Sequence, residues 1–221
     1  MDEDEFSMAL GIAPEAVFGT HKREKNSFRG ISTRKHLRIL TASAVSQEFL
    51  DEICELSALE QLTLEWPVTA ESLDGLARLS NLCKLRIDSP RNITDFTPLL
   101  RLFNLKHLSI ENAKHLGDLR WMRPLKDRLE VLWLDGSINT TQKLDSLDPL
   151  DGFCFQELSL TNVSVKDKDL SPLITCRSLT KLSCAKSVSN FEGFMMLADA
   201  RPDMACSWFS PDNWPGRKWK R

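Results

Sequence analysis

The chain has 221 residues, which is enough for one ordinary domain or a small pair of domains. Its apolar fraction of 42% and charged fraction of 27% exclude an intrinsically disordered chain, and its formal net charge of -2 gives no broad attraction to nucleic acid or to an anionic membrane. No stretch approaches the roughly 18 consecutive apolar residues of a membrane span, and the acidic start has the wrong charge for a secretory signal. We therefore expect a cytoplasmic protein.

Residues 1–33 do not fit the repeat that follows them. They contain scattered apolar side chains, namely Phe6, Met8, Leu10, Ile12, Val17 and Phe18. A stack of repeats exposes its core at both ends and needs a cover there. We interpret residues 1–33 as an N-terminal cap.

The pattern L-x-x-L-x-L recurs through residues 34–208. Its clear copies are Leu59-Leu62-Leu64, Leu82-Leu85-Ile87, Leu105-Leu108-Ile110, Leu129-Leu132-Leu134, Phe155-Leu158-Leu160 and Leu179-Leu182-Cys184. A degenerate copy opens the series at Leu37 and Ile39, and another closes it at Cys206 and Trp208. The central residues then stand at 37, 62, 85, 108, 132, 158, 182 and 206, with intervals of 23 to 26 residues. This period predicts about seven to eight structural repeats.

Each repeat contains two apolar patterns. The alternating x-L-x-L-x segment is typical of a half-buried strand. A second set of apolar residues recurs at three-residue spacing, which favours a short 3₁₀ turn with one face inward. Its members include Leu73-Leu76-Leu79, Phe96-Leu99-Leu102, Leu147-Leu150-Phe153 and Leu170-Leu173-Cys176. A unit of strand, turn and helical return buries its apolar residues only when it stacks on neighbours.

The repeats resemble the leucine-rich-repeat family, and the segment Asn92–Leu99 resembles the N-x-I-x-D-I-x-P-L return of its bacterial, internalin-like subclass. Partial echoes occur at Asp169–Leu173 and Asp148–Leu150. The resemblance implies an α/β solenoid in the shape of a curved horseshoe, with a parallel sheet on its concave face, short helical or 3₁₀ returns on its convex face, and two terminal caps. It also implies a protein-binding role.

Two departures from a regular repeat are expected. The position that often holds a stacked asparagine after the strand carries Pro67, Pro90, Ala113, Ser137 and Val163 here, so the turns must satisfy their backbone groups in another way. The interval between residues 135 and 157 is the longest and contains Gly136 and Gly152, which predicts local irregularity.

The C-terminal segment, residues 209–221, is interpreted as a second cap with a basic tail. Trp208, Phe209, Trp214 and Trp219 gather within twelve residues, either as a cover over the last repeat or as a docking patch. The final Arg217–Arg221 is expected to be solvated.

No pattern of catalytic residues is present. The sequence lacks a nucleophile elbow, a P-loop, an H-E-x-x-H helix and a dinucleotide fingerprint, and its four histidines are scattered. The six cysteines form no C-x-x-C pair and several occupy core positions, which favours buried thiols over disulfides or metal ligands. We therefore expect no enzyme, no metal and no cofactor.

The residues that alternate with the leucines are expected to form the concave face. Four acids would stack there in consecutive repeats, Glu65, Asp88, Glu111 and Asp135, and neighbouring carboxylates at that spacing repel each other. Trp133 projects an indole from the same face, where folding alone gives no reason for one. The partner-binding set predicted on this face is Glu65, Asp88, Glu111, Trp133, Asp135, Arg86, His107 and Glu157. A coincidental row of acids, softened by Lys84 and Arg86, is the alternative, and Trp66 and Trp121 are assigned structural roles.

These features predict a non-catalytic protein-binding module that acts through its concave face as an inhibitor, immunity protein or adaptor, and that is a monomer when free. A partner with a basic surface would suit the acidic column. One alternative is a scaffolding subunit that self-associates through its aromatic C-terminal end. A weaker one is a nucleic-acid-binding protein that uses His36, Arg38, Lys84 and Arg86.

Overall fold

A computed structural model describes residues 17–19 and 30–214 of the chain. Most of the predicted N-terminal cap, together with Trp219 and the basic tail, lies outside the described residues. The chain divides after His115 into two compact units. The predicted boundaries of caps and repeats stay a prediction.

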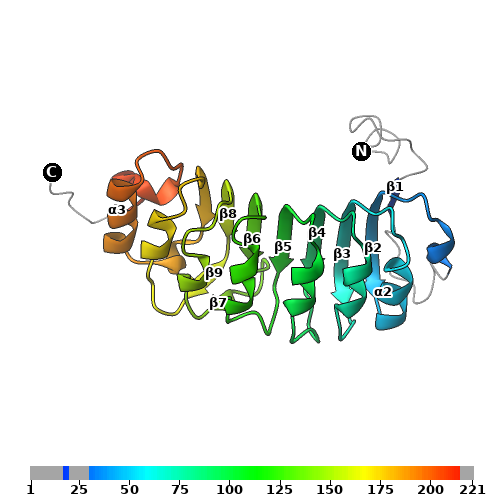
Figure 1. The fold of residues 1–221 in the computed structure, drawn as a ribbon. Helices are drawn as coiled ribbons and strands as arrows, with labels where there is room; N and C mark the ends of the chain where they lie inside the picture. The colour runs from blue at the N-terminus through cyan, green and yellow to red at the C-terminus, as the bar shows by residue number, and fades with distance from the viewer. Residues whose placement is uncertain (1–16, 20–29, 215–221) are drawn as a thin grey trace. The chain divides into compact units, whose positions relative to one another are not determined.

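The first unit is a parallel sheet with short helical returns. Its elements are β1 (Val17–Gly19), η2 (Ile31–Thr33), β2 (Ile39–Val45), α2 (Gln47–Ile53), β3 (Gln61–Val68), η3 (Asp74–Arg78), β4 (Lys84–Asp88), η4 (Thr97–Arg101) and β5 (His107–Glu111). The strands pair in chain order from β1 to β5, each parallel to the next (Figure 1). Parallel pairing of consecutive strands requires each return to cross back to the starting edge of the sheet.

The second unit repeats this design with additions. Its elements are η5 (Arg120–Leu125), β6 (Val131–Asp135), β7 (Gln142–Leu144), η6 (Asp148–Leu150), β8 (Glu157–Leu160), β9 (Val163–Val165), η7 (Ser171–Ile174), β10 (Lys181–Cys184), η8 (Lys186–Val188), α3 (Phe191–Ala200), η9 (Ser207–Phe209) and η10 (Pro211–Asn213). Strands β6, β8 and β10 form one parallel sheet, and β7 pairs with β9 in a second, two-stranded parallel sheet.

The strand register confirms the predicted repeat. In the first unit Leu62 pairs with Leu85 and Leu85 with Leu108, whereas in the second Leu158 pairs with both Leu132 and Leu182. All of these leucines are at most 2% exposed. Each contributes roughly 1.5–3 kcal/mol relative to an exposed side chain, so successive repeats add to the core of each unit. The predicted fold class, a solenoid of parallel strands with 3₁₀ returns, is confirmed.

The apolar residues at three-residue spacing also behave as predicted, since all four sets are buried. In the five returns η3 to η7, a polar side chain two residues before the 3₁₀ turn accepts the backbone N–H of the first residue of the turn. The acceptor–donor pairs are Ser72–Asp74, Asp95–Thr97, Asp118–Arg120, Ser146–Asp148 and Asp169–Ser171, at 2.8 to 3.0 Å. This recurring cap satisfies N–H groups that a short helical turn leaves without an intrahelical partner.

The predicted alignment of the first repeat is wrong by three residues. Leu40, not Leu37, pairs with Leu62, and Ala42 pairs with Leu64. Leu37 is fully buried as the first leucine of L-x-x-L-x-A. The residues of β2 that alternate with the core positions Leu40 and Ala42 are therefore Ile39, Thr41 and Ser43. The prediction had placed His36, Arg38 and Leu40 there.

The predicted irregularity after residue 135 is present as a loop followed by β7. Gly136 lies where an added Cβ would stand 2.2 Å from the carbonyl oxygen of Asn162 and 2.5 Å from that of Thr140. Its own N–H donates to Thr161 O at 2.8 Å. The backbone approaches so closely at this point that a side chain has no room.

The turns that follow the strands use left-handed backbone and side-chain bonds in place of an asparagine ladder. Ser89, Asn112 and Asn162 all have φ near +52°. Asn112 Nδ2 donates to Ser89 Oγ at 2.9 Å, one repeat earlier. Asparagine tolerates this conformation better than most residues, so two of the five turns still use it.

Helix α3 and a group of aromatic rings follow β10. Phe194 lies 6.4 Å from Trp208 and 5.7 Å from Trp214 between ring centroids. The indole N–H of Trp208 donates to Cys184 O at 2.8 Å, and that of Trp214 donates to Trp208 O at 2.9 Å. The N–H groups of both indoles are therefore hydrogen-bonded within the fold. Among the described residues no helix is long and apolar enough to cross a membrane.

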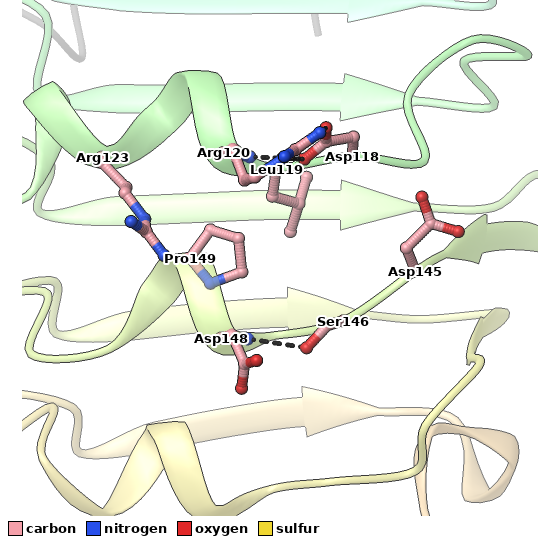
Figure 2. Close-up of a pocket in the computed structure, with 8 residues that line it drawn as sticks. All are labelled: Asp118, Leu119, Arg120, Arg123, Asp145, Ser146, Asp148 and Pro149. Atoms are coloured by element: carbon pink, nitrogen blue, oxygen red, sulfur yellow. Dashed lines mark hydrogen bonds and ion pairs between the residues drawn. The ribbon is translucent and has the colours of Figure 1, made fainter.

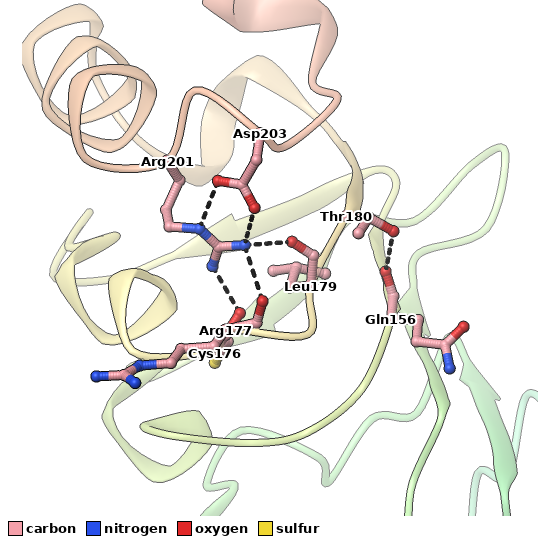
Figure 3. Close-up of polar contacts among 7 residues, drawn as sticks. All are labelled: Gln156, Cys176, Arg177, Leu179, Thr180, Arg201 and Asp203. Carbon is pink, nitrogen blue, oxygen red and sulfur yellow. Dashed lines mark hydrogen bonds and ion pairs between the residues drawn. The ribbon is translucent and has the colours of Figure 1, made fainter.

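The loop after α3 is held by one arginine. Arg201 is 6% exposed, and its guanidinium donates to the carbonyl oxygens of Cys176 at 2.6 Å and Leu179 at 2.7 Å (Figure 3). Asp203 accepts two further bonds, at 2.8 and 2.9 Å. These bonds raise the pKa of Arg201 and lower that of Asp203.

Candidate functional site

The face of each sheet that the returns do not cover, called here the open sheet face, carries the residues that alternate with the leucines. In the first unit Lys84, Arg86 and Asp88 lie on β4, and His107 and Glu111 lie on β5. All but the exposed Lys84 are half-buried, as expected for side chains that stand beside one another on an open sheet.

The acids of the first unit line up as predicted, but one of them has a basic partner. Asp88 pairs in register with Glu111. Arg86 donates to Glu111 at 2.8 Å, which neutralises that carboxylate, and Asp88 accepts from the hydroxyl of Ser89 at 2.7 Å. Glu65, on β3, has no ion-pair partner in the described part of the chain. The negative charge of this face therefore rests on Glu65 and Asp88.

The open sheet face of the second unit centres on Trp133. This indole is half-buried on β6, and its N–H donates to Glu157 Oε1 on β8 at 3.2 Å. Lys181 on β10 contacts the same oxygen at 3.1 Å. Three strands thus contribute to one network in which the indole has a fixed orientation. The sequence predicted Trp133 and Glu157 as site residues but gave no indication that they touch.

Asp135 has a structural role. Its Oδ1 accepts the backbone N–H of Thr161 at 2.7 Å and the hydroxyl of Ser159 at 2.8 Å. It therefore fixes the turn after β8, as an asparagine would in a regular ladder. Of the four acids predicted to stack, only Glu65, Asp88 and Glu111 therefore lie together in the first unit.

The cations proposed for nucleic-acid binding are largely engaged elsewhere. Arg38 forms a two-pronged ion pair with Glu60, at 2.7 and 2.8 Å, and Arg86 is paired with Glu111. His36 is exposed but lies outside β2. Lys84 is therefore the one exposed residue of the four that lies on a strand of the described sheet.

A hollow of about 260 Å³ lies on the return side of the second unit (Figure 2). It is lined by Asp118, Leu119, Arg120, Arg123, Asp145, Ser146, Asp148 and Pro149. Arg120 is held against Asp118 by three contacts of 2.6 to 3.0 Å, and these bonds lower the pKa of Asp118. Arg120 is therefore engaged by Asp118 at the start of η5.

A second hollow, of about 820 Å³, lies at the end of β10. Its lining joins open-face residues such as Lys181 and Ser183 to the thiols of Cys184 and Cys206. No sequence pattern marked these two cysteines as neighbours, because they are 22 positions apart and line one hollow only through the pairing of Lys181 with Ala205.

The six cysteines are free thiols, and only Cys54 and Cys176 are buried as predicted for core thiols, whereas Cys154 is exposed and the other three are half-buried. Burial raises the pKa of Cys54 to about 12 and also raises that of Cys176. Within the described ranges, no group of three or more histidine, cysteine or acidic side chains is arranged to hold a metal ion.

Comparison with solved structures identifies proteins of similar fold. Internalin C2 of Listeria monocytogenes matches 69% of the chain and 64% of its own length, with a TM-score of 0.52 and 23% identity. A leucine-rich-repeat protein of Leptospira interrogans matches 79% of the chain and 44% of its own length, with a TM-score of 0.55 and 18% identity. The chain has the leucine-rich-repeat fold.

A second Listeria internalin matches 79% of the chain and 61% of its own length, with a TM-score of 0.51 and 16% identity. The leucine-rich-repeat chain thus spans 44% to 64% of the length of these three proteins. No model of a known protein family matches the sequence, and no curated protein matches it. The predicted resemblance to internalin-like repeats is confirmed at the level of the fold, which does not determine function.

Proposed function

We propose that this leucine-rich-repeat chain is a non-catalytic module that binds another protein through its open sheet faces, with Trp133 as the principal anchor. Leucine-rich-repeat proteins as a group serve as protein-interaction modules. The observation that carries the proposal is the Trp133–Glu157–Lys181 network on β6, β8 and β10.

Trp133 has the properties of a binding hot spot. Tryptophan is enriched among residues whose truncation weakens an interface by 2 kcal/mol or more. Here the indole is only half-buried, so part of its apolar surface remains available to a partner. Because Glu157 already holds the indole N–H, the side chain loses little conformational freedom on binding.

A partner with a basic surface would complement Glu65 and Asp88 on the first unit. Opposite charges across an interface raise the association rate and select between partners more than they raise affinity. The ion pair with Arg86 reduces the contribution of Glu111, and the turn bonds of Asp135 remove it from this role. His107 and Arg86 would line the edge of the contact.

The Trp133 proposal is tested by comparing Trp133→Ala with Trp66→Ala. Trp66 is 38% exposed and is predicted to have a structural role, so it controls for loss of an accessible indole. The full-length chain is used to capture proteins from native lysate, and the captured protein is then purified and its affinity measured. We expect Trp133→Ala to weaken binding by about 30-fold or more, in line with a hot spot of 2 kcal/mol. Equal affinities for the two variants and the parent chain would remove Trp133 from the interface.

The charge proposal has its own test in Glu65→Lys combined with Asp88→Lys. We expect the association rate with a basic partner to fall, and the difference from the parent chain to shrink as salt is added. Association rates that are unchanged at low salt would show that the acidic positions do not contribute.

The specific role, as inhibitor, immunity protein or adaptor, is part of this proposal, as are a monomeric free state and a cytoplasmic location. Self-association through the C-terminal aromatics is disfavoured because Trp208 and Trp214 pack against Phe194 and Trp214 is only 6% exposed. Light scattering of the purified chain distinguishes the monomer from the scaffolding alternative. Identification of the captured partner distinguishes the three roles.

A further inference from the structure

The network around Trp133 contains a carboxylate oxygen that its contacts do not use. The indole N–H of Trp133 and Nζ of Lys181 both bond to Oε1 of Glu157, at 3.2 and 3.1 Å. Within residues 17–19 and 30–214 no donor bonds to the other oxygen of this carboxylate, Oε2. The Glu157 side chain is 26% exposed on the open sheet face. The carboxylate can therefore accept a further hydrogen bond from a partner.

The indole beside this carboxylate offers a flat aromatic surface. Trp133 stands on β6, and its N–H reaches a side chain of β8, the next strand of the sheet. Because neighbouring strands are about 4.8 Å apart, an indole that makes this bond lies across the sheet, with one ring face toward the strands and the other toward solvent. The π electrons of an indole attract a cation that lies over its ring face.

The charges around the indole also favour a cation. On the open sheet face, β6, β8 and β10 carry two carboxylates, Asp135 and Glu157, and one ammonium group, Lys181. The face therefore keeps a net negative charge. The Lys181 side chain is 57% exposed, so its ion pair with Glu157 is weak and is screened by salt. A second cation can share this carboxylate.

Arginine suits this arrangement better than lysine. Its guanidinium is planar and weakly hydrated, so it stacks flat on an aromatic ring. Its N–H groups point outward in the plane of the group, and Glu157 lies at the N–H edge of the indole. One guanidinium can therefore cover the ring and donate to Oε2 at the same time. The ammonium of a lysine is a compact, strongly hydrated point charge, which gains less from the ring face.

We propose that the open sheet face of the second unit recognises an arginine side chain of its protein partner, which stacks on Trp133 and donates to Oε2 of Glu157. This inference rests on the proposed function, in which Trp133 is the principal anchor of a protein interface. The contact combines a cation–π interaction with a hydrogen bond between charged groups. Removal of the positive charge from the guanidinium therefore weakens both.

The experiment uses a defined probe, a blocked pentapeptide in which arginines alternate with glycines. Matched peptides carry citrulline, which has nearly the same shape but no charge, or lysine. The NMR signal of the Trp133 indole N–H in the isotope-labelled full-length chain reports binding, and its loss in Trp133→Phe assigns it. We expect the arginine peptide to bind roughly 5-fold more tightly than the citrulline peptide, with the lysine peptide between them.

A pair of variants tests the role of the carboxylate. Glu157→Gln keeps an oxygen that can accept the indole N–H but removes the negative charge, so it should lose most of the preference for arginine over citrulline. Glu192→Gln is the same chemical change at an exposed residue of α3 and should keep that preference. The backbone amide signals of each variant show whether it is folded as the parent chain is.

Three results overturn the inference: a Trp133 signal that millimolar arginine peptide does not shift, an affinity for the arginine peptide equal to that for either matched peptide, or a full arginine preference in folded Glu157→Gln. The proposed function is tested separately, by Trp133→Ala with the captured protein. If that variant loses affinity for the captured protein but the parent chain shows no arginine preference, Trp133 remains an anchor and only its arginine contact is removed.

Discussion

Arg201 is expected to be the most sensitive polar residue of the second unit. It is 6% exposed, and its guanidinium donates to the carbonyl oxygens of Cys176 and Leu179 at 2.6 and 2.7 Å (Figure 3). A hydrogen bond from a charged group is worth about 1.5–3 kcal/mol. Arg201→Met removes both bonds and keeps the apolar stem, so packing changes little.

The expected loss is smaller than the sum of the two bonds. Met does not carry the cost of burying a charge, which offsets part of the loss, and Cys176 O still accepts from Leu179 N at 3.0 Å. Asp203, with a side chain 57% exposed, returns to water when its partner is removed. We therefore expect Arg201→Met to lower the free energy of unfolding by about 2–4 kcal/mol.

Urea unfolding followed by tryptophan fluorescence measures this change, and amide hydrogen exchange shows where it occurs. The matched control is Arg177→Met, the same chemical change at an exposed side chain of the same unit. Exchange should accelerate in β10 and α3 for Arg201→Met and stay unchanged for the control. If both variants unfold at the same urea concentration as the parent, the guanidinium does not hold this end of the unit.

Two further predictions concern the backbone and the caps of the returns. Gly136→Ala places a Cβ 2.2 Å from Asn162 O and should lower the free energy of unfolding, measured with heat or urea, by about 1–3 kcal/mol. Gly117→Ala is the control and should be tolerated, because the nearest contact of its Cβ is Asp145 Oδ2 at 3.4 Å. Similar losses for both variants would contradict the steric argument. Hydrogen bonds from Thr97 and Arg120 lower the pKa of Asp95 and Asp118, so their stabilisation is complete above the ordinary carboxyl pKa and is lost as pH falls through the lowered values. Urea unfolding at pH 7 and pH 3 should therefore show a smaller acid-induced loss for the double variant Asp95→Asn with Asp118→Asn than for the parent chain, and an equal loss would show that these caps do not titrate with folding.

The repeat could be predicted because burial imposes its period on the sequence. Leu62, Leu85 and Leu108 are buried at the same position of consecutive strands, and each unit must supply an apolar residue there. The first repeat was misaligned because Ala42, at its second strand core position, is a weaker apolar signal than Ile39, which lies two residues after Leu37. Helix α3 and the β7–β9 pair were missed since neither follows the repeat.

The site could be predicted only in part. Alternation along each strand places Glu65, Asp88, Glu111 and Trp133 on the open sheet face without any knowledge of rotamers. The partners of these side chains depend on how far each one reaches across the neighbouring strand. The bond from Trp133 to Glu157 and the pairing of Arg86 with Glu111 are of this kind.

The same contacts separate residues that serve the fold from residues available to a partner. Asp135, Asp95 and Arg201 each bond to backbone groups, so replacing any of them disturbs the repeat before it disturbs binding. Trp133 bonds to one side chain of its own open face, Glu157. The buried leucines, not this bond, supply the core of the repeats. A change at Trp133 should therefore weaken binding more than it lowers the unfolding free energy. This combination distinguishes an interface residue from a structural one, and Asp135→Lys is unsuitable as a test because it would change both quantities.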